Sequence, residues 1–298
     1  MRHFLEIDEL TPDELAAVLD LAEVAEPAQR LAGQGMALVF EKPSARTRHS
    51  LEMAVVQLGG HPSYIQASEV GLDVRESVED VTNTLACYYR VIGARVYAHR
   101  TVERMAAVGA APVVNLLSDR AHPLQALADL LTIRQNFGTL AGLTVAFVGD
   151  ANNVCRSLAI GAHLAGMKVR VAHPRGYGFA GGDLDRIRAA GGEPLVTNDP
   201  VEAVAGANVL YTDVWTSMGQ EAEHAKRIAD FAGFQVTDSL LSHANPAAIF
   251  LHCLPAHRGE EVTDTVVDGA ASRVWQQAEN RMHAARGLLS FLLAPGEG

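Results

Sequence analysis

A short basic segment, Ser44-Ala45-Arg46-Thr47-Arg48, places two guanidinium groups and two hydroxyl groups within five residues. Guanidinium groups carry a permanent charge, and their forked N–H donors match the oxygens of a phosphate. The apolar run 36–40 precedes the segment, and apolar residues at helical spacing follow it to Leu58, so it lies on a strand-to-helix turn. A helix N-terminus offers free backbone N–H groups to an anion. Taken alone, the segment is better explained as a solvated, hydroxyl-capped basic loop, but together with the motifs described next it predicts a phosphate site.

A second polar pair, His122 and Gln125, opens the strongly apolar helical segment 122–137. Residues three positions apart share one face of a helix. A neutral imidazole can donate to a carbonyl oxygen, and a glutamine amide oxygen can accept from an NH2 group. Taken alone, however, His122 is better explained as a helix cap than as a catalytic group.

Two polar turns follow apolar runs in the second half of the chain. The turn 149–154 stands where a dinucleotide fingerprint would stand, but it carries a carboxylate and two amides in place of GxGxxG. It predicts either a polar substrate contact or a capped turn. Asp213 directly follows the run 208–212 and suits an ammonium group, and Gly219 would let the loop fold back over a ligand. An ordinary connecting loop with a buried tryptophan is the alternative.

The segment 252–261 gathers two histidines, a thiol and an arginine within seven residues. A metal site is the first interpretation, but the spacing matches zinc sites poorly, and we predict no metal. For Cys253 the alternative is a core cysteine. The three cysteines are widely spaced, without a CxxC pair, which indicates reduced thiols.

Apolar runs alternate with helical patterns along most of the chain, which is typical of βαβ units with parallel sheets. We therefore predict an α/β fold of two doubly wound parallel-sheet domains joined by long helices. The first domain comprises 1–133, completed by a C-terminal helix 277–298, and the second comprises 134–276. The predicted strands are 36–40, 62–65, 91–96, 112–115, 144–148, 167–172, 208–212 and 248–251, and the clearest helical patterns are 77–89, 102–108, 122–137 and 273–293.

The bulk composition narrows the possible partners. The 298 residues are 48% hydrophobic and 20% charged, with a formal net charge of -11, which argues against nucleic acid and anionic membranes. No run approaches the roughly 18 apolar residues of a membrane span. The first residues lack an apolar core of signal-peptide length, so we expect a cytoplasmic protein.

Together these segments resemble the aspartate/ornithine carbamoyltransferase family, with five motifs in the family's order between about residues 36 and 290. Ser217-Met218-Gly219 and His252-Cys253-Leu254-Pro255 resemble its ornithine branch. The resemblance implies the substrates carbamoyl phosphate and L-ornithine, no cofactor, and a homotrimer or a multiple of trimers.

The resemblance also implies roles for individual residues. Arg95, His122 and Cys253 would be catalytic, and Gln125 would fix the carbamoyl NH2 group. The implied carbamoyl-phosphate site comprises Ser44, Ala45, Arg46, Thr47, Arg95, His122, Gln125, Cys253, Leu254 and Arg281. The implied ornithine site comprises Asn153, Asp213, Ser217 and Met218.

Two positions depart from the family pattern. Ala45 stands where the family usually has a threonine, and Gly71 aligns with a glutamine that reaches a neighbouring subunit's substrate in the family. We predict that Arg75, the only cation of that loop, takes over part of this role. The alternative is a solvated arginine paired with Glu76 or Glu79.

Two other functions remain open. One is a carbamoyltransferase for a related amine, such as putrescine or an acylated ornithine. The other is a catalytically silent paralogue, for which Ala45 and Gly71 are the only support. A nucleotide-binding dehydrogenase is disfavoured because the turn at Gly149 lacks the glycine fingerprint.

Overall fold

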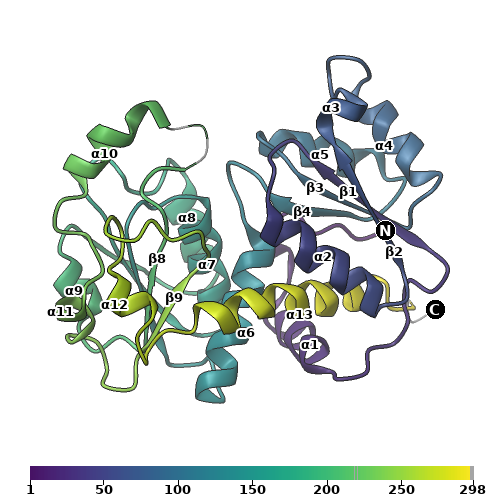
Figure 1. The fold of residues 1–298 in the computed structure, drawn as a ribbon. Helices are drawn as coiled ribbons and strands as arrows, with labels where there is room; N and C mark the ends of the chain where they lie inside the picture. The colour runs from purple at the N-terminus through teal and green to yellow at the C-terminus, as the bar shows by residue number, and fades with distance from the viewer. Residues whose placement is uncertain (218, 220, 296–298) are drawn as a thin grey trace. The chain divides into compact units, whose positions relative to one another are not determined.

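The computed structural model describes residues 1–217, 219 and 221–295. The chain forms two compact units, one of Met1–Leu131 with Glu279–Gly298 and one of Thr132–Ala278. Each unit contains one parallel β-sheet with helices (Figure 1). The predicted α/β class with two doubly wound parallel sheets is confirmed.

The first unit has a four-stranded sheet in the order β2-β1-β3-β4. Its central strands are fully buried and, apart from Arg95 at the end of β3, apolar, as a parallel sheet covered on both faces requires. The strands are β1 (Gly35–Phe40), β2 (His61–Gln66), β3 (Val91–Arg95) and β4 (Val113–Leu117). The helices that begin within this unit are α1 (Pro12–Glu23), α2 (Ala45–Gln57), α3 (Ala67–Val70), α4 (Val78–Ala86), α5 (His99–Val108) and α6 (Pro123–Phe137), after the 3-10 turn η1 (Ile7–Glu9).

The second unit has a five-stranded sheet in the order β7-β6-β5-β8-β9. Its strands are β5 (Thr144–Val148), β6 (Lys168–Ala172), β7 (Leu195–Thr197), β8 (Val209–Thr212) and β9 (Ile249–His252). Its helices are α7 (Asn153–Leu164), α8 (Asp183–Ala189), α9 (Pro200–Val204), α10 (His224–Asp230), α11 (Asp238–Leu241) and α12 (Asp264–Val267), with the 3-10 turn η2 (Glu221–Glu223).

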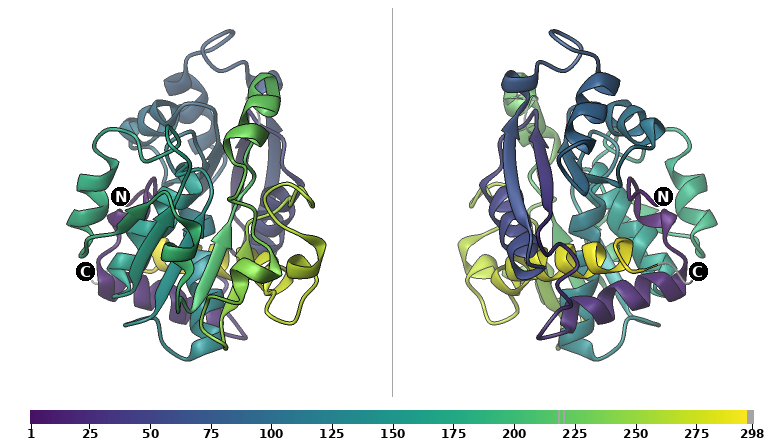
Figure 2. Two further views of the ribbon diagram at one scale, coloured as in Figure 1. Left: turned by 90° about the vertical axis from the view of Figure 1, so that its left-hand side faces the viewer. Right: turned by 90° about the vertical axis from the view of Figure 1, so that its right-hand side faces the viewer.

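The C-terminal helix α13 (Val274–Leu292) begins in the second unit and ends in the first. Within the first unit it lies beside α1, as both views of Figure 2 show. Arg286 donates to the carbonyl oxygens of Ala22 and Val24, each at 2.7 Å. These bonds satisfy carbonyl groups at the C-terminal end of α1 and fasten α13 to the first unit.

The strand order of each sheet explains where its polar turns lie. In the first sheet β1 lies between β2 and β3, and in the second β5 lies between β6 and β8, so the direction of winding reverses beside each of these strands. Ligands of such sheets bind beyond the carboxyl ends of the strands at the point of reversal. The segment 44–48 follows β1, and Arg95 ends β3. The turn at 149–152 follows β5, and Asp213 follows β8.

All eight predicted strands are present, and their ends agree with the prediction to within two residues. Strand β7 was missed. It has only three residues at the sheet edge, where Leu195 and Val196 are exposed, so it lacks the buried apolar run that marks the others. Among the described residues, no helix is long and apolar enough to cross a membrane.

Candidate active site

The basic segment forms the N-terminus of helix α2. The Ser44 hydroxyl oxygen accepts from the Thr47 backbone N–H at 3.3 Å, so Ser44 is the N-cap. Ala45 and Arg46 are exposed on the first turn, whereas Thr47 is buried. Arg48 donates to Glu52 at 2.8 Å and lies over the Tyr64 ring, so it is held by its own helix and by β2.

Two buried arginines converge on the hydroxyl group of Thr47. Arg95 is 5% exposed and donates to Thr47 Oγ1 at 3.3 Å; Arg281 is 4% exposed and donates to the same atom at 3.4 Å. Arg281 also donates to Gln125 Oε1 at 3.1 Å. The first unit thus brings together four predicted site residues from β3, α2, α6 and α13, and two of them carry permanent positive charge.

Gln125 is held in place by a residue that the sequence analysis missed. Its Nε2 group donates to Asp129 Oδ1 at 2.7 Å, one helical turn further along α6. This bond identifies the amide nitrogen as the atom facing Asp129, which leaves the amide oxygen toward Arg281. The i, i+4 spacing of a glutamine and an aspartate was the only signal for this contact.

His122 precedes α6 and is buried beside the same arginines. Burial, together with the charges of Arg281 and Arg95, lowers the pKa of His122 well below its ordinary value of 6.5. At neutral pH the side chain is therefore a neutral imidazole, which can donate one hydrogen bond and accept another.

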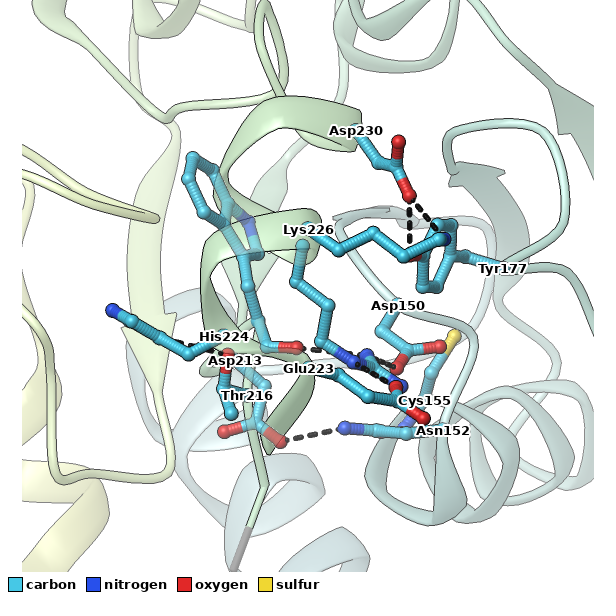
Figure 3. A network of polar contacts seen from close by, with 12 residues as sticks. Asp150, Asn152, Cys155, Tyr177, Asp213, Thr216, Glu223, His224, Lys226 and Asp230 are labelled. Carbon is cyan, nitrogen blue, oxygen red and sulfur yellow. Dashed lines mark hydrogen bonds and ion pairs between the residues drawn. The ribbon is translucent and has the colours of Figure 1, made fainter. Parts of the chain in front are cut away.

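In the second unit, Asp213 accepts hydrogen bonds at both carboxylate oxygens. Asn152 donates to Oδ2 at 2.9 Å (Figure 3), and the Cys253 thiol donates to Oδ1 at 3.0 Å. Asn152, which the sequence analysis did not select, also caps α7 through the backbone N–H groups of Val154 and Cys155. The carboxyl ends of β5, β8 and β9 therefore meet at one aspartate.

The remaining predicted residues of the second unit lie in the segments that follow β5, β8 and β9. Asn153 is the first residue of α7, Ser217 lies in the segment after Asp213, and Leu254 follows Cys253 with a φ of 59°. The prediction for Met218 lies outside the described residues.

Arg227 on α10 joins the two polar turns and was also missed. It is 6% exposed; one guanidinium nitrogen donates to Asp150 Oδ2 at 2.7 Å and to the Trp215 carbonyl oxygen at 2.8 Å. Its Nε donates to Glu223 at 3.0 Å (Figure 3). Burial raises the pKa of Asp150 even though Arg227 acts in the opposite direction. Arg227 thereby connects the turn after β5 to the segment after β8.

Asp213, His252 and Cys253 form a cluster whose potential ligand atoms lie within 4.8 Å of one another. His252 Nδ1 accepts from the Leu254 backbone N–H at 2.9 Å, and His252 Nε2 lies 3.2 Å from Glu261 Oε1. Both ring nitrogens are therefore engaged by protein groups, and the imidazole offers no spare lone pair to an ion in this arrangement. We therefore interpret Asp213, His252 and Cys253 as a group whose side chains are held in place by hydrogen bonds.

The two units and their polar sites define a class of two-domain α/β proteins with a buried cationic site in one domain and an acid–thiol pair in the other. Comparisons with known proteins make this class specific. Residues 2–135 match the aspartate/ornithine carbamoyltransferase carbamoyl-P binding domain, and residues 141–292 match the Asp/Orn binding domain of the same family. The chain belongs to the aspartate/ornithine carbamoyltransferase family.

Individual relatives agree with this membership. An ornithine carbamoyltransferase of Thermus thermophilus is 56% identical over 286 residues, covering 95% of this chain and 93% of that protein. The solved ornithine carbamoyltransferase of Pyrococcus furiosus is 44% identical, with a TM-score of 0.93 and coverage of 97% and 96%. A solved N-acetyl-L-ornithine transcarbamylase is 27% identical, with a TM-score of 0.89 and coverage of 97% and 99%.

Replacing Arg227 tests whether it holds the second unit together. In Arg227→Met the buried Asp150 carboxylate loses its charge partner, so we expect the free energy of unfolding to fall by about 3–5 kcal/mol. Chemical denaturation followed by circular dichroism measures this loss. The neighbouring variant Lys226→Met removes exposed contacts with Asp230 and the Tyr177 hydroxyl group and should change the midpoint little. Equal losses in the two variants would contradict the assignment.

The lowered pKa of His122 predicts a pH dependence of stability. Below about pH 6.5 the unfolded chain binds a proton at this residue that the folded protein does not, so this contribution destabilises the fold as the pH falls. Above that pH the contribution is constant. In His122→Gln the slope of the unfolding free energy against pH should therefore be smaller between about pH 5 and 6.5. An unaltered slope would show that His122 protonates equally in both states.

Proposed function

We propose that this chain transfers the carbamoyl group of carbamoyl phosphate to the δ-amine of L-ornithine, giving L-citrulline and phosphate in arginine biosynthesis. The observation that carries the proposal is the convergence of Arg95 and Arg281 on Thr47, within the part of the chain that matches the carbamoyl-P binding domain. Residues 1–133 with 277–298 form the carbamoyl-phosphate domain, and residues 134–276 form the ornithine domain.

Carbamoyl phosphate binds at the N-terminus of α2. The phosphate oxygens accept from Ser44, Arg46, Thr47 and the backbone of Ala45, with Arg281 completing the charge. Arg95 and neutral His122 donate to the carbonyl oxygen, and the Gln125 amide oxygen accepts from the carbamoyl NH2 group. Attack builds negative charge on the carbonyl oxygen, and donors held in fixed positions stabilise that charge without reorganising.

Ornithine binds in the second domain. Asp213 accepts from the α-ammonium group, and Asn153, Ser217 and Met218 complete the contacts with the α-amino acid end. The δ-amine, with a lysine-like pKa of about 10.4 in water, must lose a proton before it can attack. Cys253 and Asp213, which are hydrogen-bonded to each other at 3.0 Å, are the two residues proposed to help place that proton.

The reaction balances without a cofactor. The lone pair of the neutral δ-amine forms the new C–N bond at the carbamoyl carbon, and the bond between that carbon and the phosphate oxygen breaks. The phosphate leaves with the bonding electrons at residues 44–47, and the amine nitrogen releases its second proton. Cys253 and Leu254 are the residues proposed to lie between the two substrates.

The assembly proposed for the active enzyme is a homotrimer or a multiple of trimers in the cytoplasm. Arg75 is exposed in the turn that follows Gly71 and contacts Glu76 at 3.3 Å. Glu79, its other potential partner, is engaged by Arg104, which also binds Asp73. An exposed pair of this kind holds an arginine weakly, so Arg75 can exchange Glu76 for a substrate phosphate of a neighbouring subunit.

The Arg75 role is tested by the Michaelis constant for carbamoyl phosphate. Removing a cation that contacts the phosphate should raise this KM at least threefold in Arg75→Ala, with the ornithine KM unchanged. Arg100→Ala, which removes another exposed arginine of the same unit, serves as the control. An unchanged carbamoyl-phosphate KM would leave Arg75 as a surface residue paired with Glu76.

The reaction itself is tested with a colorimetric assay for the ureido product. The purified chain is given carbamoyl phosphate with L-ornithine, N-acetyl-L-ornithine, putrescine or L-aspartate in turn. Because Asp213 suits a free α-ammonium group, we expect turnover of L-ornithine to exceed that of the acylated amine and of putrescine by at least a hundredfold. Preference for putrescine or N-acetylornithine would identify a related carbamoyltransferase, and no turnover of any amine would identify a silent paralogue.

A further inference from the structure

His252 and Glu261 form a completely buried pair beneath the segment that carries Cys253 and Leu254. Both side chains are 0% exposed, and His252 Nε2 lies 3.2 Å from Glu261 Oε1. His252 ends β9, while Glu261 lies nine residues further along the chain. Neither residue belongs to the predicted sites, and the reaction outlined above gives neither of them a task.

The hydrogen bonds of His252 fix its protonation state. A backbone N–H can only donate, so the N–H of Leu254, 2.9 Å from His252 Nδ1, requires a lone pair on that nitrogen. The ring is therefore neutral, with its proton on Nε2 directed at the Glu261 carboxylate. The Glu261 carboxylate favours this tautomer because its oxygen accepts a hydrogen bond from an Nε2–H group, whereas it would repel the lone pair of an unprotonated Nε2.

Glu261 holds the far end of the same segment. Its Oε1 atom also accepts from the His257 backbone N–H at 2.5 Å, so one carboxylate oxygen joins both ends of residues 252–257. The backbone of Glu261 is anchored in turn, since its carbonyl oxygen accepts from the Val236 N–H at 2.8 Å. Within the described part of the chain, Glu261 Oε2 is buried without a hydrogen-bond partner. A buried carboxylate with hydrogen bonds to only one oxygen contributes little to the stability of the fold, because its burial costs desolvation free energy. A functional role for Glu261 is therefore favoured.

The segment between these two anchors has an unusual backbone. Leu254 adopts a φ of 59°, a left-handed conformation that is strained for a branched side chain. The bond from its N–H to His252 Nδ1 holds it there. Cys253 lies immediately before Leu254, and its thiol donates to Asp213 Oδ1 at 3.0 Å. The direction of the thiol therefore depends on the backbone that His252 fixes.

We propose that His252 and Glu261 are positioning residues for carbamoyl transfer. Glu261 holds His252 in the Nε2-protonated tautomer, and His252 Nδ1 holds the Leu254 backbone so that Cys253 and Leu254 meet the reacting groups in the required orientation. This inference rests on the proposed function, because citrulline formation is its kinetic readout. Misplacing a catalytic segment by a small distance lowers the rate more than it lowers substrate binding.

Two amide substitutions separate the two contacts of His252. In His252→Asn the side-chain oxygen falls near the position of Nδ1 and can still accept from Leu254, but it no longer reaches Glu261. In His252→Gln the amide reaches Glu261 but leaves the Leu254 N–H without its acceptor. We expect kcat to fall at least tenfold in His252→Gln and less than threefold in His252→Asn, with both KM values within threefold of the wild type.

Thermal unfolding of the same two variants distinguishes a positioning role from a merely structural one. If His252 only stabilised the fold, kcat and the unfolding midpoint would fall together. Because His252→Asn leaves Glu261 buried without its partner, it should have the lower unfolding midpoint but the higher kcat. A kcat that falls in parallel with the midpoint, or a His252→Gln variant within threefold of the wild-type kcat, would overturn the proposal.

Neutron diffraction from deuterium-exchanged crystals of the wild-type protein tests the tautomer without any variant. The account requires deuterium on His252 Nε2 and none on Nδ1, and deuterium on Nδ1 would overturn it even if the variants fail to fold. Failure of the proposed function is recognised separately, since the wild-type protein would then form no citrulline whatever the state of His252.

Discussion

Two buried guanidinium groups share one hydroxyl oxygen, and much of the first unit is organised to hold them there. Arg95 and Arg281 both donate to Thr47, and their charges lower the pKa of His122 beside them. Like charges at low exposure repel strongly, so a site of this kind favours an anion with several oxygens. Carbamoyl phosphate, the substrate proposed for this site, is such an anion, and its carbonyl oxygen would develop further negative charge during attack.

Arg281 reaches this place because helix α13, at the end of the chain, packs against helix α1, near its beginning. Helix α13 packs so closely against α1 that a Cβ atom on Gly287 would lie 2.5 Å from the Val18 carbonyl oxygen. Arg286, five residues beyond Arg281, donates to two carbonyl groups at the C-terminal end of α1. In the second unit, by contrast, Asp213 is held by hydrogen bonds from the Asn152 amide and the Cys253 thiol.

The features that could be predicted from the sequence are those that depend on residues close together in the chain. Buried apolar runs predicted eight strands and the parallel class, and the turn after β1 was identified because a strand and a helix flank it. Arg95 and Arg281 had no local signal and were selected only through the family resemblance. Asp129 and Asn152 were missed because their roles are contacts with the predicted residues Gln125 and Asp213. Arg227 was missed because its contact with Asp150 joins residues 77 positions apart. Glu261 was quoted within its motif but given no role, because its partner was not visible from spacing.

The proposed function depends most on Arg281, which the last helix supplies to the carbamoyl-phosphate site. Calorimetric titration of carbamoyl phosphate into the ornithine-free protein measures the affinity of this site directly. We expect Arg281→Met to weaken binding at least tenfold, about 1.4 kcal/mol, whereas Glu279→Gln, which changes an exposed residue of the same helix, should stay within threefold of the wild type. An Arg281→Met protein that binds carbamoyl phosphate as tightly as the wild type would contradict the account.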